Sequence, residues 1–213
     1  MIILVGGVKG GSGKSTIATN LAVSLANLKH DVLVVDTDSQ QTTSNWYQRR
    51  VDEDTNNDHV IHCERQSGRV IEAINDKAKR YQDIIIDAGG YDSVELRSAL
   101  MVADIIIAPV QPSQADLETF GNLNELVENA NAMRQEQIKA IAVISRAPTH
   151  HLVTETEEAQ EFINDHTDFS LAGQVIHDRK VYRDAMYEGK GVIELANDSA
   201  KLEISTLAKD MLK

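Results

Sequence analysis

Short apolar runs alternate with amphipathic stretches along nearly the whole chain, and this alternation strongly constrains the fold. Runs that are apolar on both faces are typical of buried parallel strands, and helices of ordinary length between them supply the crossovers that parallel strands require. The main apolar runs are Met1–Val8, Val32–Val35, Ile84–Ile86, Ile105–Val110 and Ile138–Ile144. The sequence therefore predicts an α/β fold with a mostly parallel, twisted sheet covered by helices on both faces.

The remaining elements follow from the same periodicities. Short strands are predicted at Val60–Cys63, as a sheet edge, and at Gln174–Ile176, and Pro109 and Pro112 are expected to end the run that begins at Ile105. The acidic segment Asp52–Asp58 is expected to be a solvated loop. Helices are predicted over Lys14–Leu28, Gln41–Val51, Arg69–Tyr81, Ser93–Val102, Leu117–Arg134, Thr154–Asp165 and Leu202–Leu212. No repeat or linker interrupts this pattern, so one domain over residues 1–213 is the simplest expectation.

Composition narrows the functional classes. The net charge of −12 argues against a dedicated nucleic-acid binder, because phosphate contacts need clustered Lys and Arg. A single cysteine, Cys63, excludes an intrachain disulfide and weighs against a cysteine-built metal site. The apolar N-terminus is too short to span a membrane and lacks the features of a signal peptide. These observations predict a cytoplasmic protein.

A glycine-rich loop between the first predicted strand and helix is built to hold phosphate. Glycines at positions 10, 11 and 13 let the backbone curl so that its N–H groups point inward, and the helix N-terminus adds partial positive charge. Lys14 would reach the β- and γ-phosphates, and the Ser15 hydroxyl would ligate Mg²⁺. The usual pattern G-x-x-x-x-G-K-[ST] requires glycine at position 8, which is Val8 here. A variant loop is therefore expected.

The variant, Lys9-Gly10-Gly11-Ser12-Gly13-Lys14-Ser15-Thr16, resembles the deviant Walker A motif of the ParA/MinD family of ATPases. The resemblance implies a P-loop NTPase fold that binds ATP with Mg²⁺. It also implies catalytic roles for Lys14 and for Lys9, which would reach the nucleotide of the other subunit in an ATP-dependent homodimer. Nucleotide contacts are expected from Gly10, Gly11, Ser12, Gly13, Lys14, Ser15 and Thr16.

Carboxylates follow two of the predicted strands, where parallel strands present their carboxyl ends. The segment Asp36-Thr37-Asp38-Ser39-Gln40 resembles a second family motif, and Asp87 after Ile84–Ile86 resembles the Walker B aspartate. The resemblance implies that Asp38 orients the attacking water, and that Ser15, Asp36 and Asp87 organise the metal. It further places Arg146 among the adenine contacts.

The resemblance covers nearly the whole chain and is greatest to the small, ParF-like plasmid partition ATPases. It implies slow ATP hydrolysis stimulated by a small centromere-binding protein, and a homodimer that binds nonspecific DNA or forms higher-order assemblies, with nucleoid association in the first case. Because the glycine loop begins at Lys9, the N-terminal helix-turn-helix domain of larger relatives is not expected here. The basic residues available for DNA are few: Arg179, Lys180, Arg183, Lys190 and Lys201.

Three alternatives remain open. A MinD-like membrane ATPase would need a basic amphipathic C-terminal helix, but Leu202–Leu212 carries Glu203 and Asp210 and better suits packing on the core, so no membrane partner is expected. An ATPase that positions a protein cargo is compatible with every motif. A biosynthetic P-loop enzyme with a small-molecule substrate would share the fold, although Lys9 and the Asp36–Gln40 segment weigh against it.

Overall fold

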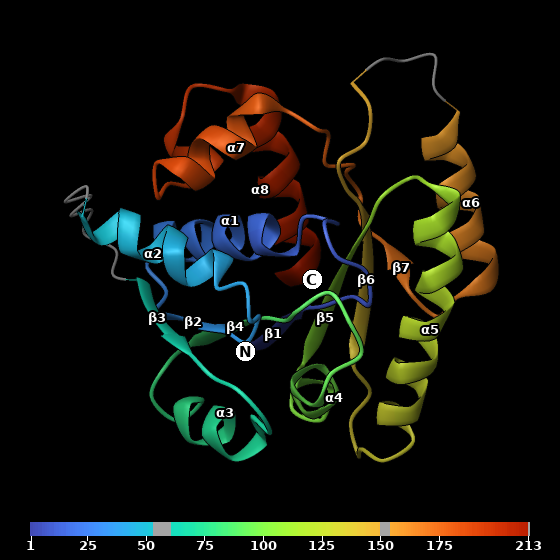
Figure 1. Ribbon diagram of the computed structural model, residues 1–213, viewed down its shortest axis with the longest axis horizontal. Coiled ribbons are helices and arrows are strands. Elements are labelled where there is room, and N and C mark those ends of the chain that lie inside the picture. The colour runs from blue at the N-terminus through green and yellow to red at the C-terminus, as the bar shows by residue number, and fades with distance from the viewer. Residues whose placement is uncertain (53–60, 150–153, 213) are drawn as a thin grey trace.

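The computed structural model describes residues 1–52, 61–149 and 154–212 of the chain. Within these residues, seven parallel strands form one sheet in the order β3-β2-β4-β1-β5-β6-β7 (Figure 1). The strands are β1 (Ile2–Val5), β2 (Val32–Asp36), β3 (Ile61–Arg65), β4 (Asp83–Asp87), β5 (Ile105–Val110), β6 (Lys139–Ile144) and β7 (Ser170–Leu171). This confirms the predicted parallel sheet, with β3 at its edge.

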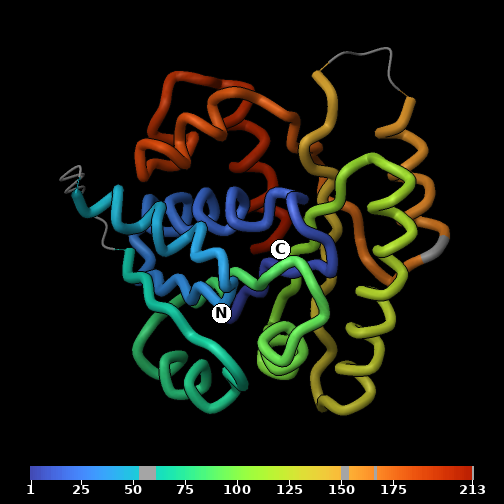
Figure 2. The backbone as a smooth tube through the Cα atoms, viewed as in Figure 1, coloured from blue at the N-terminus to red at the C-terminus, as the bar shows by residue number. Residues whose placement is uncertain are grey.

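Helices cover both faces of the sheet. One face carries α1 (Lys14–Asn27), α2 (Thr42–Asp52), α7 (Lys180–Tyr187), the short 3-10 helix η1 (Val192–Glu194) and α8 (Asp198–Leu212). The other face carries α3 (Ile71–Lys77), α4 (Val94–Leu100), α5 (Gln114–Asn131) and α6 (Glu155–His166). Figure 2 shows the C-terminal segment beside the N-terminal α1, and α8 packs directly on α1.

The core consists of two layers, one on each side of the sheet. Successive side chains of a strand point to opposite faces, so Ile3 and Val5 pack under α1 while Ile2 and Leu4 pack under α3–α5. Strands β2, β4 and β5 show the same division. Both layers are buried, which explains why the strands are apolar at nearly every position.

Several predicted boundaries differ from the structure. Pro109 lies inside β5, opposite Val143 of β6, and does not end the strand. Strand β1 pairs with β5 only as far as Ile107, so beyond that residue one side of β5 is an edge, where a residue without an N–H is tolerated. Within Asp52–Asp58, Asp52 belongs to α2, and the other residues lie outside the described part of the chain.

The predicted strand at Gln174–Ile176 is wrong. The strand β7 lies earlier, at Ser170–Leu171, and Ile176 instead exchanges single backbone hydrogen bonds with Ile144 and Ala147. Helix α7 was not predicted: it has only eight residues, of which Tyr182 and Ala185 are buried.

Parallel strands bring their carboxyl ends to one edge of the sheet, and the register sets which residues meet there. Asp87 lies opposite Asp36 on one side and Val5 on the other. The glycine loop after β1 therefore lies next to Asp87 at the end of β4, with Asp36 one strand further away. Among the described residues, no helix is long and apolar enough to cross a membrane.

Candidate functional site

The loop between β1 and α1 curls around the start of the helix. Gly11 and Gly13 have φ of 81° and 91°, the left-handed region that glycine adopts without a Cβ penalty. Gly13 occupies the N-cap position of α1 and supplies no side-chain cap, so the first N–H groups of the helix have no side-chain acceptor there. This is the geometry that an anion at a helix N-terminus requires.

Lys14 lies within this loop with its side chain largely buried. Its Nζ donates a 2.6 Å hydrogen bond to the Lys9 carbonyl oxygen, which folds the side chain back along the loop. Burial lowers the pKa of Lys14, whereas the carboxylates of Asp87, Asp38 and Asp116 act to raise it. The ammonium is thus held beside the loop, where phosphate oxygens would bind.

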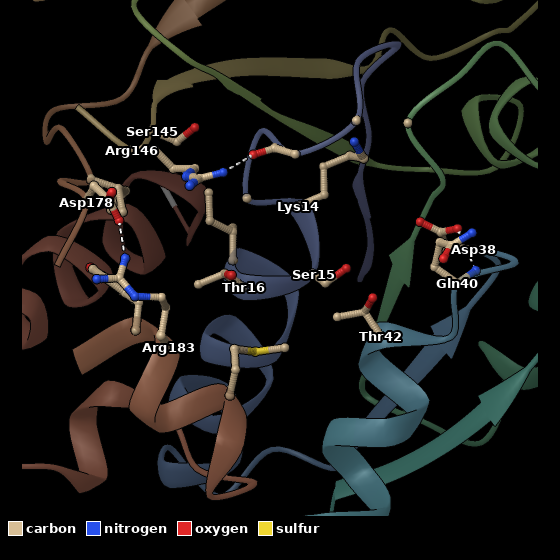
Figure 3. Close-up of a pocket in the computed structure, with 18 of the residues that line it drawn as sticks. Lys14, Ser15, Thr16, Asp38, Gln40, Thr42, Ser145, Arg146, Asp178 and Arg183 are labelled. Atoms are coloured by element: carbon tan, nitrogen blue, oxygen red, sulfur yellow. Dashed lines mark hydrogen bonds and ion pairs between the residues drawn. The ribbon is translucent and has the colours of Figure 1, made fainter. Parts of the chain in front are cut away.

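Side chains from the ends of β5 and β6 hold the carbonyl groups of the loop. Ser145 Oγ donates to the Ser12 carbonyl at 2.6 Å, Arg146 Nη1 to the Gly11 carbonyl at 2.8 Å, and Gln111 Nε2 to the same oxygen at 3.3 Å. Figure 3 shows Arg146 directed at the loop. Fixing the carbonyl groups fixes the peptide planes, so the loop is preorganised for a ligand. The predicted contact of Arg146 with adenine stays a prediction, and Gln111 was not among the predicted site residues.

Asp87, at the end of β4, is fully buried. Its Oδ2 accepts a 2.6 Å hydrogen bond from Thr43 Oγ1, while Oδ1 has no hydrogen-bond partner among the described residues. Burial raises the pKa of Asp87 to about 7. A buried carboxylate oxygen that lacks a donor is costly, and a hydrated cation between it and Ser15 would satisfy it. The residues present therefore fit Mg²⁺, a hard cation that prefers oxygen ligands.

Asp36 has a different set of contacts. Its Oδ2 accepts hydrogen bonds from the Ser44 backbone N–H at 2.8 Å and from Ser44 Oγ at 2.7 Å, and its Oδ1 accepts from the Asp38 N–H. Both oxygens thus hold the loop that leads into α2. The predicted contribution of Asp36 to the metal site stays a prediction.

Asp38 lines a cavity that the glycine loop also lines (Figure 3). Its Oδ1 accepts a 2.9 Å hydrogen bond from the Gln40 N–H. The carboxylate is half-buried. This position suits the predicted orientation of an attacking water, which stays a prediction.

Lys9 points away from this cavity. Its Nζ lies 3.5 Å from Asp116 Oδ2 on α5, and Ser113 Oγ donates to that same oxygen at 2.8 Å. Lys9 is 38% exposed and does not line the cavity that Lys14 lines. It therefore does not reach the nucleotide site of its own chain in this conformation.

The cavity has a volume of about 750 Å³ and runs from the glycine loop to α7. This volume falls within the range of small-molecule sites. The predicted residues that line it are Gly10, Gly11, Gly13, Lys14, Ser15, Thr16, Asp38 and Arg146. Other lining residues, for which the sequence predicted no nucleotide contact, include Thr42, Gly90, Tyr91, Ile176, His177, Asp178, Tyr182, Arg183 and Met186.

Gly90 brings the segment after β4 onto the glycine loop. A Cβ at this position would lie 2.6 Å from the Gly10 backbone N and Cα. Only glycine permits this approach, which places Tyr91 at the cavity wall. The segment beside the predicted metal site is thereby in direct contact with the loop that would hold phosphate.

Comparisons with known proteins identify the family to which this chain belongs. Residues 3–192 match the CobQ/CobB/MinD/ParA nucleotide binding domain family. Maintenance of carboxysome distribution protein A from Halothiobacillus neapolitanus is 24% identical over 213 residues, 99% of this chain and 95% of that protein.

Two solved structures share the fold over nearly the whole length of this chain. A plasmid partition protein from Borrelia burgdorferi bound to AMPPNP has a TM-score of 0.75 and 20% identity, and the match covers 99% of this chain and 98% of that one. MinD from Pyrococcus horikoshii complexed with Mg-ADP has a TM-score of 0.74 and 20% identity, with 99% and 94% covered. Because the family match spans most of the chain and includes the glycine loop and both carboxylate segments, the protein belongs to the CobQ/CobB/MinD/ParA nucleotide-binding family.

Proposed function

We propose that this chain, acting as one domain, is an ATPase in which ATP binding closes a homodimer and hydrolysis opens it, so that a cargo is segregated or positioned. The observation that carries the proposal is the cavity of about 750 Å³ with Lys14, Ser15 and the glycine loop at one end. The buried Asp87 oxygen without a partner beside that end supports a nucleotide bound together with a divalent cation.

The residues divide the chemistry between them. Lys14 and the loop N–H groups would bind the β- and γ-phosphates, and Ser15 and Asp87 would hold Mg²⁺. Bound Mg²⁺ would neutralise charge on the phosphate oxygens. Asp38, which lines the cavity, would orient the water that attacks the γ-phosphate. Such a reaction depends on positioning and charge neutralisation, which this arrangement supplies.

Closure of the dimer would involve Lys9. Its ion pair with Asp116 joins two segments of the same chain at 3.5 Å and leaves the ammonium partly exposed. Release of Lys9 toward the nucleotide of a second copy would give ATP a higher affinity for the closed dimer than for the monomer. That difference in affinity is what shifts the equilibrium toward closure.

The names of two similar proteins suggest what kind of cargo this chain would distribute. A relative is named for carboxysome distribution and a structural neighbour for plasmid partition, and both names describe the distribution of a large object. Plasmid partition with a small centromere-binding protein is our first candidate. The 24% identity to the carboxysome protein over nearly the full length of both chains makes distribution of a protein cargo the second.

Direct binding of nonspecific DNA would rely on a C-terminal group of basic residues, most of which are already paired. Arg179 pairs with Glu203, Lys180 with Asp184, Arg183 with Asp178 and Lys190 with Glu188. Such pairs reduce the net positive charge available to phosphates. We therefore propose DNA binding for the ATP-bound dimer, where two copies combine their charges, and expect it to weaken steeply with added salt.

The first experiment measures ATP turnover and ATP-dependent dimerisation for the native chain and for Lys9→Ala, with and without nonspecific DNA and a candidate partner. The expected result is slow turnover that DNA and partner stimulate. In Lys9→Ala, ATP binding should persist while dimerisation and stimulation are lost. Lys79→Ala is the matched control, because Lys79 is an exposed lysine just after α3 whose ion pair is with Asp76 of that helix.

Each alternative outcome points to another function. Unstimulated turnover that is indifferent to Lys9 would contradict the switch and favour a biosynthetic enzyme. Liposome pelleting tests the MinD-like alternative. The apolar face of α8, with Ile204, Leu207 and Met211, is buried on the core, so we expect no ATP-dependent pelleting.

A further inference from the structure

The large cavity extends well beyond the phosphate end. Its far end is formed by Ile176, His177, Tyr182 and Met186, which come from the segment before α7 and from α7 itself. If the phosphates lie on the glycine loop, as in the proposed function on which this inference rests, only this far end is left for the nucleoside. Figure 3 shows the Asp178–Arg183 ion pair on the same side of the cavity.

The wall at this end is not part of a regular strand. His177 forms an isolated bridge with Ala147, and the segment continues without repetitive structure until α7 begins at Lys180. Two backbone hydrogen bonds, from Ala147 N–H to Ile176 O and from Asp178 N–H to Ala147 O, tie it to the end of β6. Backbone hydrogen bonds to the end of β6 therefore hold this segment only as far as Asp178. The side chains that form the cavity wall must be held in place by other contacts.

These contacts are made with Glu203, in the middle of α8. Its side chain is 2% exposed. Three side chains share hydrogen bonds with its carboxylate: His177 through Nδ1 at 2.8 Å, Arg179 through Nε at 2.9 Å and Tyr182 through its hydroxyl at 2.7 Å. Two of these three, His177 and Tyr182, line the cavity, whereas Glu203 does not.

A buried carboxylate is stable only when its charge is paired and its oxygens are hydrogen-bonded. The Arg179 guanidinium supplies the charge, with Nη2 also 2.8 Å from Oε1. Burial and the neighbouring Glu203 carboxylate raise the pKa of Tyr182, so its hydroxyl stays protonated and remains a donor. The three donors are thus held in one arrangement by a single acceptor group.

We infer that Glu203 is a positioning residue for the nucleoside end of the cavity: by holding His177, Arg179 and Tyr182 together, the C-terminal helix sets the shape of the wall against which the nucleoside packs. The hydrogen bonds of the Glu203 carboxylate go to His177, Arg179 and Tyr182, and none of these residues is among those that would bind phosphate. The influence of Glu203 on binding should therefore depend on the nucleoside and not on the phosphates.

The test is Glu203→Gln in the full-length protein, which keeps the volume but removes the charge. We expect KM for MgATP in steady-state hydrolysis to rise about tenfold, the effect of losing a buried charged hydrogen bond, with kcat nearly unchanged. Inorganic tripolyphosphate, which lacks a nucleoside, should inhibit the native and variant proteins with the same Ki. Tyr182→Phe removes only one donor and should shift KM in the same direction by a smaller factor without threatening the fold.

Asp83→Asn is the matched control. Asp83 is also a buried carboxylate paired with a histidine, His30. It lies at the start of β4, at the end of the strands opposite to the one that carries Asp87. We expect the Asp83→Asn variant to have a lower melting temperature than the native protein, as we also expect for Glu203→Gln, but an unchanged KM for MgATP.

The outcomes separate the two proposals. The positioning role would be overturned if Glu203→Gln weakened the binding of ATP and of tripolyphosphate by the same factor. It would also be overturned if Glu203→Gln changed neither KM for MgATP nor Ki for tripolyphosphate and Tyr182→Phe left KM unchanged. If the native protein neither binds nor hydrolyses ATP, the proposed function itself fails, and this inference fails with it.

Discussion

At the scale of single residues, the site depends on a few groups held in costly environments. Asp87 carries a buried oxygen without a partner, Lys14 is an ammonium whose pKa burial lowers, and Gly90 sits against the glycine loop where no side chain fits. Such costs are typical of binding sites, where they are offset when the ligand arrives.

Gly90 gives the sharpest residue-scale prediction. In Gly90→Ala, the new Cβ would lie 2.6 Å from the Gly10 backbone, so the segment after β4 or the glycine loop must shift. We expect ATP affinity to fall roughly tenfold and the free energy of unfolding to fall by about 1–3 kcal/mol. Gly121→Ala on α5, where nothing lies within 4 Å, is the control and should be neutral or stabilising. Equal affinities for both variants would contradict the close contact.

Cys63 on β3 is a reporter of the sheet edge. Burial, with smaller effects from Asp36 and other neighbours, raises the pKa of its thiol to about 12. At pH 8 the reactive thiolate is therefore rare in the folded state, whereas a thiol in the unfolded chain has a pKa of about 8.5. Alkylation by iodoacetamide should be slower in the native protein than in urea, on the order of a thousandfold. Mass spectrometry follows it directly, because this is the only cysteine of the chain. Similar rates, after correction with a free thiol, would show that β3 opens readily.

At the scale of elements, the start of α2 connects the two carboxylate segments. Asp36 binds the Ser44 N–H and hydroxyl, and Thr43 of the same turn donates to Asp87. The first turn of α2 is thus held by both strand ends, and its position determines where Asp38 and Thr42 face the cavity.

The variant Asp36→Asn separates a structural role from a metal role. Loss of the hydrogen bonds at the start of α2 should lower the free energy of unfolding by about 1–2 kcal/mol. If Asp36 serves only the helix, Mg²⁺ should enhance ATP binding as much in the variant as in the native protein. Ser44→Ala removes the partner side chain and is the control for stability. A selective loss of the Mg²⁺ effect in Asp36→Asn, and not in Ser44→Ala, would assign Asp36 to the metal site.

At the scale of the whole molecule, the cavity lies between segments that are far apart in the sequence. The glycine loop, the segments after β2, β4 and β6, and α7 all contribute to its wall, and Glu203 of α8 supports that wall from behind. A ligand that contacts all of these segments binds the folded state and not the unfolded chain, so it must stabilise the folded protein.

Heating experiments test this linkage. At a ligand concentration about a hundred times Kd, MgATP should add roughly 2.7 kcal/mol to the free energy of unfolding, which for a chain of this size corresponds to a rise in Tm of about 5–10 °C. Chelation of Mg²⁺ should remove part of the rise. Asp87→Asn should abolish the part that depends on Mg²⁺. An increase in Tm that is insensitive to Mg²⁺ in the native protein would contradict the cation site.

Much of the fold and of the phosphate end followed from local pattern. Apolar runs, helical spacing and strand-terminal carboxylates predicted the parallel sheet, the glycine loop and the places of Lys14, Ser15, Asp38 and Asp87 at one edge. These features can be predicted locally, because the period of a strand or helix and the conformation of a glycine depend on residues close together in the sequence. Parallel strands also share one direction, so residues that follow them come to the same edge of the sheet.

Only the tertiary structure decided the rest. It placed Gln111 and Ser145 on the carbonyl groups of the loop, paired Lys9 with Asp116, and put Glu203 behind the far wall of the cavity. These contacts join residues from different strands and helices, and each depends on the order of strands in the sheet and on how α7 and α8 pack across α1. No local pattern carries that information, because burial and pairing of such polar groups arise only when distant segments meet.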